Sequence, residues 1–245
     1  MENKSLDNGL DTGPDLARSA RSAAREPSSA AERAVERALG GRRAAYADEV
    51  SRLLEATFVL VERTGVLEPR VGDILREAGL SNQAFYRHFT SKQALLVAVL
   101  DEGVRILASY LGHRMQAASS PGERVGEWLR GVLEQALSPA AARATRPFVL
   151  ARARLAEAHA REVADSERSL TALVRDALRD AAAAGELPAV DPNRDAETLY
   201  HLAMGWVEAR LRESAPADRR DAERLVAFAR HGLLRGAARG DGAEV

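Results

Sequence analysis

The chain has 245 residues, which is enough for one large domain or two small ones with a real hydrophobic core. Its 46% hydrophobic residues, 29% charged residues and net charge of −1 are ordinary for a globular protein, and the scarcity of aromatic residues favours helix over strand. The sequence has no cysteine, which excludes disulfides and thiolate sites. It has no apolar segment typical of a signal peptide and no run of about 18 apolar residues, so we expect a cytoplasmic protein.

The first 44 residues are expected to form a disordered or partly helical arm. Residues 1–28 are polar, with scattered charges and no apolar period. A capping box at residues 29–32 predicts a short helix over 29–39, which Gly40-Gly41 would end. The pair Arg42-Arg43 that follows is either solvated at the end of this helix or enters the minor groove of DNA.

Apolar residues recur at helical spacing in three successive segments, 48–64, 71–78 and 81–89. The last two segments are joined by Gly79-Leu80-Ser81, in which the glycine can end one helix in the left-handed conformation and the serine can cap the next. This arrangement predicts a helix-turn-helix with one supporting helix, over residues 45–92. The inward-facing residues are Val50, Leu53, Leu54, Thr57, Phe58, Val61, Val71, Ile74, Leu75, Ala78, Ala84, Phe85 and Phe89.

The third of these helices would be a recognition helix that lies in the major groove of DNA. Its outer face would present Asn82, Gln83, Tyr86 and Arg87. Asparagine and glutamine side chains pair with adenine, and arginine pairs with guanine. Tyr86 and His88 can donate to phosphate, and Lys92, in the first turn of the next helix, can hold a phosphate together with nearby backbone N–H groups.

These stretches resemble the TetR/AcrR family of transcription regulators. Residues 53–65 and 73–81 look like the first two helices of that family, and Phe85-Tyr-Arg-His-Phe-Thr-Ser-Lys92 followed by Ala94-Leu95-Leu96 looks like its most recognisable segment. The resemblance implies that Tyr86, His88 and Lys92 contact phosphate and that Asn82, Gln83 and Arg87 face bases.

Two residues depart from the family pattern. Ala84 lacks the hydroxyl that the family usually carries there, so one phosphate contact is lost. Arg70 replaces the threonine that usually caps the second helix. It either reaches the DNA itself, or Pro69 simply sets the start of the helix.

Beyond residue 92 the sequence predicts helices only. The first, over 92–116, would be about 40 Å long at about 1.5 Å per residue. No strand pattern and no solenoid repeat is present, so the expected fold class is all-α, with a helix-turn-helix head and a C-terminal helical bundle over 93–240. The further helices are expected at 123–138, 147–160, 163–184, 192–213 and 217–238.

The family resemblance implies that residues 93–240 hold a ligand cavity and a dimer contact. The expected pocket walls are apolar and suit a hydrophobic or amphipathic molecule: Tyr110, Met115, Trp128, Leu133, Phe148 and Leu155. The last two helices would form a four-helix bundle with a second copy through Leu199, Leu202, Val207, Leu211, Leu225, Phe228 and Leu233. An ordinary intramolecular core is the alternative role for these residues.

No sequence pattern typical of an enzyme is present. The histidines have no metal-ligand spacing, and we find neither a Gly-rich phosphate loop nor a Gly-x-Ser-x-Gly motif, so we expect no catalysis, no metal and no cofactor. The predicted function is a ligand-responsive homodimer, a repressor released from double-stranded operator DNA by a small hydrophobic or amphipathic effector. The alternatives are an all-helical protein-interaction module without DNA binding and a helical-bundle enzyme, which the missing Glu-x-x-His pairs disfavour.

Overall fold

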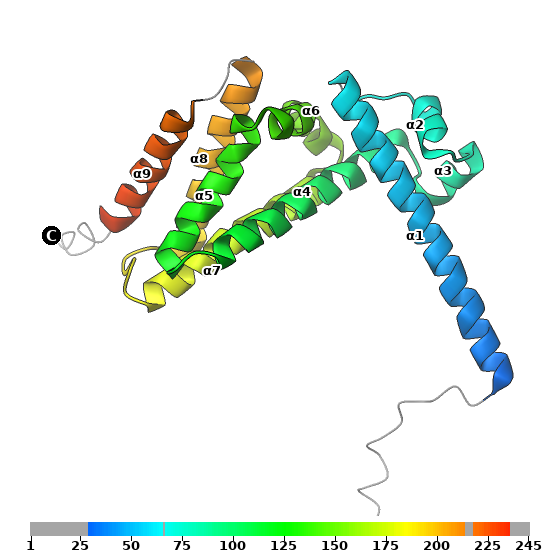
Figure 1. Ribbon diagram of the computed structural model, residues 1–245, viewed down its shortest axis with the longest axis horizontal. Coiled ribbons are helices and arrows are strands. Elements are labelled where there is room, and N and C mark those ends of the chain that lie inside the picture. Colours follow the sequence, from blue (N-terminus) through cyan, green and yellow to red (C-terminus); the bar gives the residue numbers. More distant parts are fainter. Residues whose placement is uncertain (1–28, 66, 214–217, 236–245) are drawn as a thin grey trace, which may run out of the picture. The chain divides into compact units, whose positions relative to one another are not determined.

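The computed structural model describes residues 29–65, 67–213 and 218–235 (Figure 1). In this part of the chain the regular structure is entirely helical, which confirms the predicted all-α fold. The expected arm at residues 1–28 lies outside the described residues. The described residues fall into two units, one ending at Asp48 and the other beginning at Glu49. The helices are α1 (Ala30–Thr64), α2 (Val71–Ala78), α3 (Asn82–His88), α4 (Lys92–Gln116), α5 (Pro121–Leu137), α6 (Pro139–Ala158), α7 (Ala160–Ala183), α8 (Pro192–Glu213) and α9 (Arg219–Arg235).

The helix α1 is continuous where a break at Gly40-Gly41 was predicted, so that prediction is wrong. A glycine ends a helix efficiently in the left-handed conformation, which neither Gly40 nor Gly41 adopts. Each glycine costs about 1 kcal/mol inside a helix relative to alanine, which is not enough to break it. The predicted capping box is confirmed, because the backbone N–H of Glu32 donates to Ser29 Oγ and that of Ser29 donates to Glu32 Oε2, both at 3.1 Å.

The unit that begins at Glu49 contains two buried apolar clusters. The first packs the C-terminal half of α1 against α2, α3 and the first turns of α4. Its fully buried members include Leu53, Ile74, Phe85, Leu95 and Val99. Since Leu95 and Val99 follow residue 92, the core of the head reaches into the long helix beyond the expected domain boundary.

The same cluster extends onto the C-terminal helices α6 and α7. The ring of Phe58 on α1 packs at a tilt against Phe148 on α6, with 5.7 Å between the ring centroids. The Ser166 hydroxyl on α7 donates to Asp101 Oδ1 on α4 at 2.8 Å. The head is therefore joined to the C-terminal helices by side-chain packing as well as by the continuous helix α4.

The second cluster forms the core of the C-terminal bundle and involves α4, α5, α7, α8 and α9. Trp128 of α5 is completely buried in it, and its indole N–H donates to the Leu170 carbonyl on α7 at 3.1 Å. A buried polar hydrogen without a partner would cost about 1–3 kcal/mol, so this bond allows the large ring to lie in the core.

Three helices of the bundle, α5, α6 and α7, begin earlier than predicted, and the first two of them begin at a Ser-Pro pair. Ser120 and Ser138 accept hydrogen bonds from backbone N–H groups three residues later, and the prolines that follow occupy the first turn, where no N–H is needed. The starts predicted at 123 and 147 are therefore wrong. Pro147 lies buried inside α6, because Ser138 and Pro139 start the helix before this second proline is reached.

Candidate nucleic-acid interface

The helices α2 and α3 and the turn between them form the predicted helix-turn-helix (Figure 1). Gly79 adopts φ +63°, ψ +37°, and the N–H of Leu80 returns to the Leu75 carbonyl at 3.0 Å, which closes the end of α2. The Ser81 hydroxyl accepts the N–H of Ala84 at 3.2 Å and so starts α3. Both signals expected in the three-residue turn are confirmed.

The helix α3 has one buried face and one exposed face. Ala84 and Phe85 are buried against the head, and Phe89 packs beside Phe85 with 6.0 Å between the ring centroids. On the other side Asn82, Gln83 and Tyr86 are exposed, Tyr86 by 65%. The polar residues predicted to read bases and phosphates therefore lie on the accessible side of the helix.

Arg87 and His88 are both bound by one carboxylate, that of Glu49 on α1. His88 Nε2 lies 2.6 Å from Glu49 Oε2, and Arg87 Nη1 donates to the same oxygen at 3.0 Å. The His88 side chain is only 9% exposed, whereas that of Arg87 is 39% exposed. The hydrogen bond from His88, reinforced by the charge of Arg87, lowers the pKa of Glu49. This carboxylate is charged near neutral pH and holds the last turn of α3 against α1.

A second contact from α1 fixes the end of α2. Arg52 Nη2 donates to the Ala78 carbonyl at 2.5 Å and to the Gly79 carbonyl at 3.1 Å. These carbonyls are among the groups that a helix end leaves without partners, so the guanidinium stabilises the turn. Glu49 and Arg52 thus support α3 and α2 from one side of α1.

Sequence reasoning did not find Glu49 or Arg52. They lie 38 and 26 residues before their partners at Arg87 and Ala78. Both belong to the polar positions of an amphipathic helix, whose usual role is solvation. No local spacing distinguishes them, because their contacts depend on how three helices pack.

The two remaining predicted DNA contacts lie at helix starts. Arg70 precedes α2, is exposed and makes no side-chain cap, as expected from its lack of an acceptor. Lys92 begins α4 and is half-buried, and Ser91 beside it caps this helix by accepting the N–H of Ala94 at 3.1 Å. The contacts of all these residues with DNA remain predictions.

Comparison with known proteins agrees with this geometry. The family model for bacterial regulatory proteins of the tetR family matches residues 53–99. The match covers the helix-turn-helix head and the first turns of α4, which therefore resemble the DNA-binding region of that family. Comparison with curated protein sequences gave no match.

Solved structures of TetR-type fold resemble most of this chain. A protein of Pseudomonas aeruginosa PAO1 described as a transcriptional regulator is 23% identical, with a TM-score of 0.62 over 78% of this chain and 92% of that one. A protein of Mesorhizobium loti described as a TetR-family transcriptional regulator is 16% identical, with a TM-score of 0.58 over 79% and 96% of the two chains. FadR of Bacillus subtilis, solved with stearoyl-CoA, is 13% identical, with a TM-score of 0.58 over 76% and 98%.

The TetR-type fold assigns α1–α3 to an N-terminal DNA-binding domain and the later helices to a helical C-terminal domain. Its members are transcription regulators and not enzymes. Among the described residues no three potential metal ligands come together. In the same part of the chain no helix is both long and apolar enough to cross a membrane.

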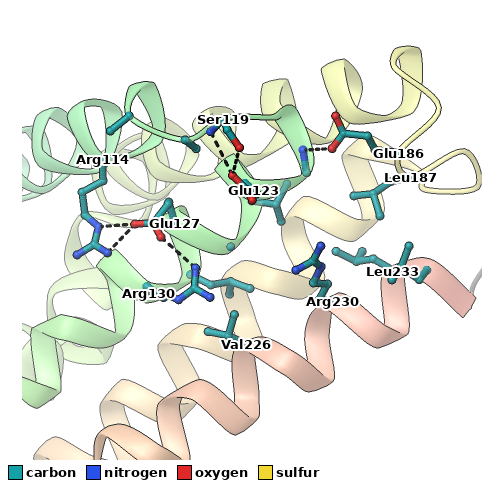
Figure 2. A pocket seen from close by; sticks show the side chains of 17 residues that line it. Arg114, Ser119, Glu123, Glu127, Arg130, Glu186, Leu187, Val226, Arg230 and Leu233 are labelled. Carbon is teal, nitrogen blue, oxygen red and sulfur yellow. Dashed lines mark hydrogen bonds and ion pairs between the residues drawn. The ribbon is translucent and has the colours of Figure 1, made fainter.

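The predicted pocket residues of this TetR-type C-terminal domain mostly lie in its packed core. Five of them are buried: Met115, Trp128, Leu133, Phe148 and Leu155. Tyr110 is 39% exposed, and its hydroxyl accepts a hydrogen bond from Arg114 Nη1 at 3.0 Å. None of the six lines the pocket of about 630 Å³ that the described residues form between the end of α4, the start of α5, the turn after α7 and the inner face of α9 (Figure 2).

The residues predicted for a dimer contact divide into two groups. Leu199, Val207 and Leu211 are buried in the second apolar cluster, so in the single chain they serve the alternative role of intramolecular core. Phe228 of α9 is 71% exposed and stays available to a partner. The remaining three, Leu202, Leu225 and Leu233, are partly buried beside the same cluster.

Proposed function

We propose that this chain acts as a homodimeric repressor that binds operator DNA through α3 and is released by a small hydrophobic or amphipathic effector. Two recognition helices, one from each copy, would enter successive major grooves about 34–36 Å apart. Effector binding would favour a dimer with another separation, and it can do so only as far as the effector binds the two states with different affinity.

One observation carries the DNA-binding part of this proposal. The helix α3 is anchored by Ala84 and Phe85, which are buried, while Asn82, Gln83 and Tyr86 are exposed together on its outer side. Tyr86 packs the edge of its ring against Phe85 and remains 65% exposed on an otherwise polar helix face. The Tyr86 hydroxyl can donate to a phosphate, beside the amides of Asn82 and Gln83, which can pair with bases.

The effector part is supported by the fold and by one relative. FadR of Bacillus subtilis, whose fold this chain shares, was solved with stearoyl-CoA, a molecule with a long apolar chain and an anionic head. The head of the present chain shares its first buried cluster with α6 and α7. A ligand that changes the packing of the C-terminal helices would therefore act on the head through side chains as well as through α4.

The test begins with selection of bound fragments from random double-stranded DNA, followed by affinity measurements on the selected sequence. Gln83→Ala should lose about 1–3 kcal/mol of discrimination at one base pair. Lys92→Ala should weaken binding to all sequences and reduce the slope of log K against log salt by about 1. Arg179→Ala is the matched control, because Arg179 is an exposed cation on α7 that pairs with Asp176, and it should change neither.

Two results would contradict the proposal. Selection that enriches no sequence would favour the alternative function, an all-helical protein-interaction module that does not bind DNA. Equal losses in Lys92→Ala and Arg179→Ala would show that binding follows the overall charge of the chain and not the surface of α3.

A further inference from the structure

The pocket of about 630 Å³ is formed by four separate parts of the C-terminal domain (Figure 2). Arg114 comes from the last turn of α4, Val125 and Leu129 from α5, and Leu187 from the turn after α7. The inner face of α9 contributes Val226, Arg230 and Leu233, which recur at i, i+4 and i+7. A volume of this size lies within the range of about 300–1,000 Å³ found for small-molecule sites.

The inner wall of the pocket is apolar. Val125, Leu129, Leu187 and Val226 are each at most 5% exposed, so they present only edges of a packed core to the cavity. Apolar walls of this kind bind hydrocarbon by removing it from water, at roughly 25 cal/mol per Å². The pocket therefore suits the apolar part of a ligand.

Two of the carboxylates around the pocket already have partners. Glu127 accepts from Arg114 Nη2 at 2.6 Å and from Arg130 Nη1 at 3.0 Å. Glu186 Oε2 accepts from the Ser120 hydroxyl at 2.7 Å and from the N–H of Gly122 at 2.8 Å. Glu127 is thus neutralised by two arginines, and Glu186 has its hydrogen bonds supplied by two neutral donors of the protein.

The third carboxylate and the third arginine behave differently. Glu123 is turned toward the α4–α5 turn, where Ser119 donates to it through its N–H at 3.1 Å and through its hydroxyl at 2.5 Å. Arg230 makes no hydrogen bond or ion pair with any residue that the structure describes, although its charge is close enough to Glu123 to help lower the pKa of that carboxyl. Figure 2 shows it projecting from α9 toward α5, beside Leu233. The pocket thus combines apolar walls with one guanidinium that no described carboxylate binds directly.

We propose that this pocket binds a small anionic amphipath, with its carboxylate on Arg230 and its apolar chain against Val125, Leu129 and Val226. A guanidinium suits a carboxylate because two parallel N–H donors match its two oxygens. This site is not the pocket predicted from the sequence, because none of the six residues expected to form the pocket walls lines it.

The position of the pocket would let a bound ligand regulate DNA binding. This part of the proposal rests on the proposed function. It touches the end of α4, the helix that begins at the DNA-binding head, and the inner face of α9, whose outer face exposes Phe228. A ligand between them changes how α9 packs on α5. Since α9 is the helix proposed to contact the second copy, this would alter the separation of the two heads.

Calorimetric titration of the full chain with decanoate, without DNA and below its micelle concentration, tests the site directly. Decanoate should bind with saturation, and decanol, which has the same chain without the charge, at least tenfold more weakly. Arg230→Gln should weaken decanoate binding about tenfold. Arg224→Gln is the control, because Arg224 is an exposed cation on the same helix that does not line this pocket.

A second variant closes the pocket without removing a charge. A side chain at Gly126 would extend into the cavity, and its Cβ would meet only the flexible end of Arg130, at 3.3 Å. Gly126→Leu should therefore abolish decanoate binding while the thermal melting temperature shows that the chain still folds. Decanoate that binds no more tightly than decanol, or binds Arg230→Gln and Gly126→Leu as it binds the parent chain, would overturn the proposal.

The regulatory step has its own readout. Decanoate should change the affinity of the parent chain for the selected operator and leave that of Arg230→Gln unchanged. Binding of decanoate without any change in operator affinity would refute the proposed regulation of DNA binding but would leave the binding site standing. Failure to select an operator at all would instead count against the proposed function, whatever the calorimetry gives.

Discussion

Glu49 is the residue that determines how the recognition helix ends. It binds Arg87 and His88 together, and these side chains were expected from the sequence to serve DNA. His88 is nearly buried in this contact, so its first role is to hold α3 in place. Arg87 is more exposed and can exchange the carboxylate for a base, at the cost of leaving Glu49 without that partner.

The first prediction concerns the pH dependence that Glu49 imparts. Because its pKa is lowered in the folded chain, Glu49 stabilises the fold at pH values above its usual pKa near 4.5, and this stabilisation is lost as the pH falls through the lowered value. Glu49→Gln should therefore melt at a lower temperature than the parent at pH 7, and the difference should disappear in acid. Thermal denaturation followed by circular dichroism across this range measures it.

Glu62→Gln provides the control for this prediction, because Glu62 is an exposed carboxylate on the same helix. It should melt like the parent chain at every pH. A deficit in Glu49→Gln that persists unchanged in acid would show that the carboxylate acts through packing and not through its charge.

For single residues, the sequence correctly predicted the features that depend only on neighbouring residues. The inward positions of Ala84 and Phe85, the cap at Ser81 and the left-handed Gly79 are confirmed, since each depends on helical periodicity or on one turn. The partner of His88 could not be predicted, because it lies 39 residues away on another helix. Contacts of this kind follow from packing, which the sequence specifies only globally.

Whole helices show where start and stop signals succeed and where they fail. Serine and aspartate caps followed by proline begin α5, α6 and α8. Glycine pairs and isolated prolines were less informative, since Gly40-Gly41 and Pro147 lie inside helices. A glycine or proline changes the cost of a helical position, but it ends a helix only when a cap or a turn offers the backbone a better alternative.

The second prediction concerns how closely α4 and α5 approach each other. A Cβ added to Gly131 of α5 would clash with the side chain of Leu111 on α4, which is completely buried and cannot move aside. Gly131→Ala should lower the free energy of unfolding by about 1–3 kcal/mol despite the better helix propensity of alanine. Urea denaturation measures this change.

Gly112 in α4 is the matched control, because a Cβ added there meets nothing within 4 Å. Gly112→Ala should raise the free energy of unfolding by up to about 1 kcal/mol through helix propensity alone. If both substitutions stabilise the chain, α4 and α5 have room between them and the glycine at 131 is not required by their packing.

In the molecule as a whole, the head and the C-terminal domain are connected more extensively than the sequence suggested. The long helix α4 runs from the head into the C-terminal domain. The structure adds the Phe58–Phe148 contact and an ion pair between Glu68 and Arg154 at 2.6 Å. Because α6 contributes to both, a change in the bundle reaches the head at two places, and rotation of the head about α4 alone would break these contacts.

The last prediction concerns the assembly. Phe228 exposes 71% of its side chain, the largest exposed fraction among the large hydrophobic residues described, and large aromatic residues are common interface anchors. We expect the parent chain of 26.4 kDa to sediment as a dimer. Phe228→Asp should sediment as a monomer with unchanged helix content, because the side chain makes no contribution to the buried core of the single chain. Its affinity for a two-fold symmetric operator should fall, since one copy contacts only one half-site.

Leu150→Asp, which alters an apolar residue 41% exposed on α6, should remain dimeric. A dimer that survives Phe228→Asp but not Leu150→Asp would move the interface from α9 to α6.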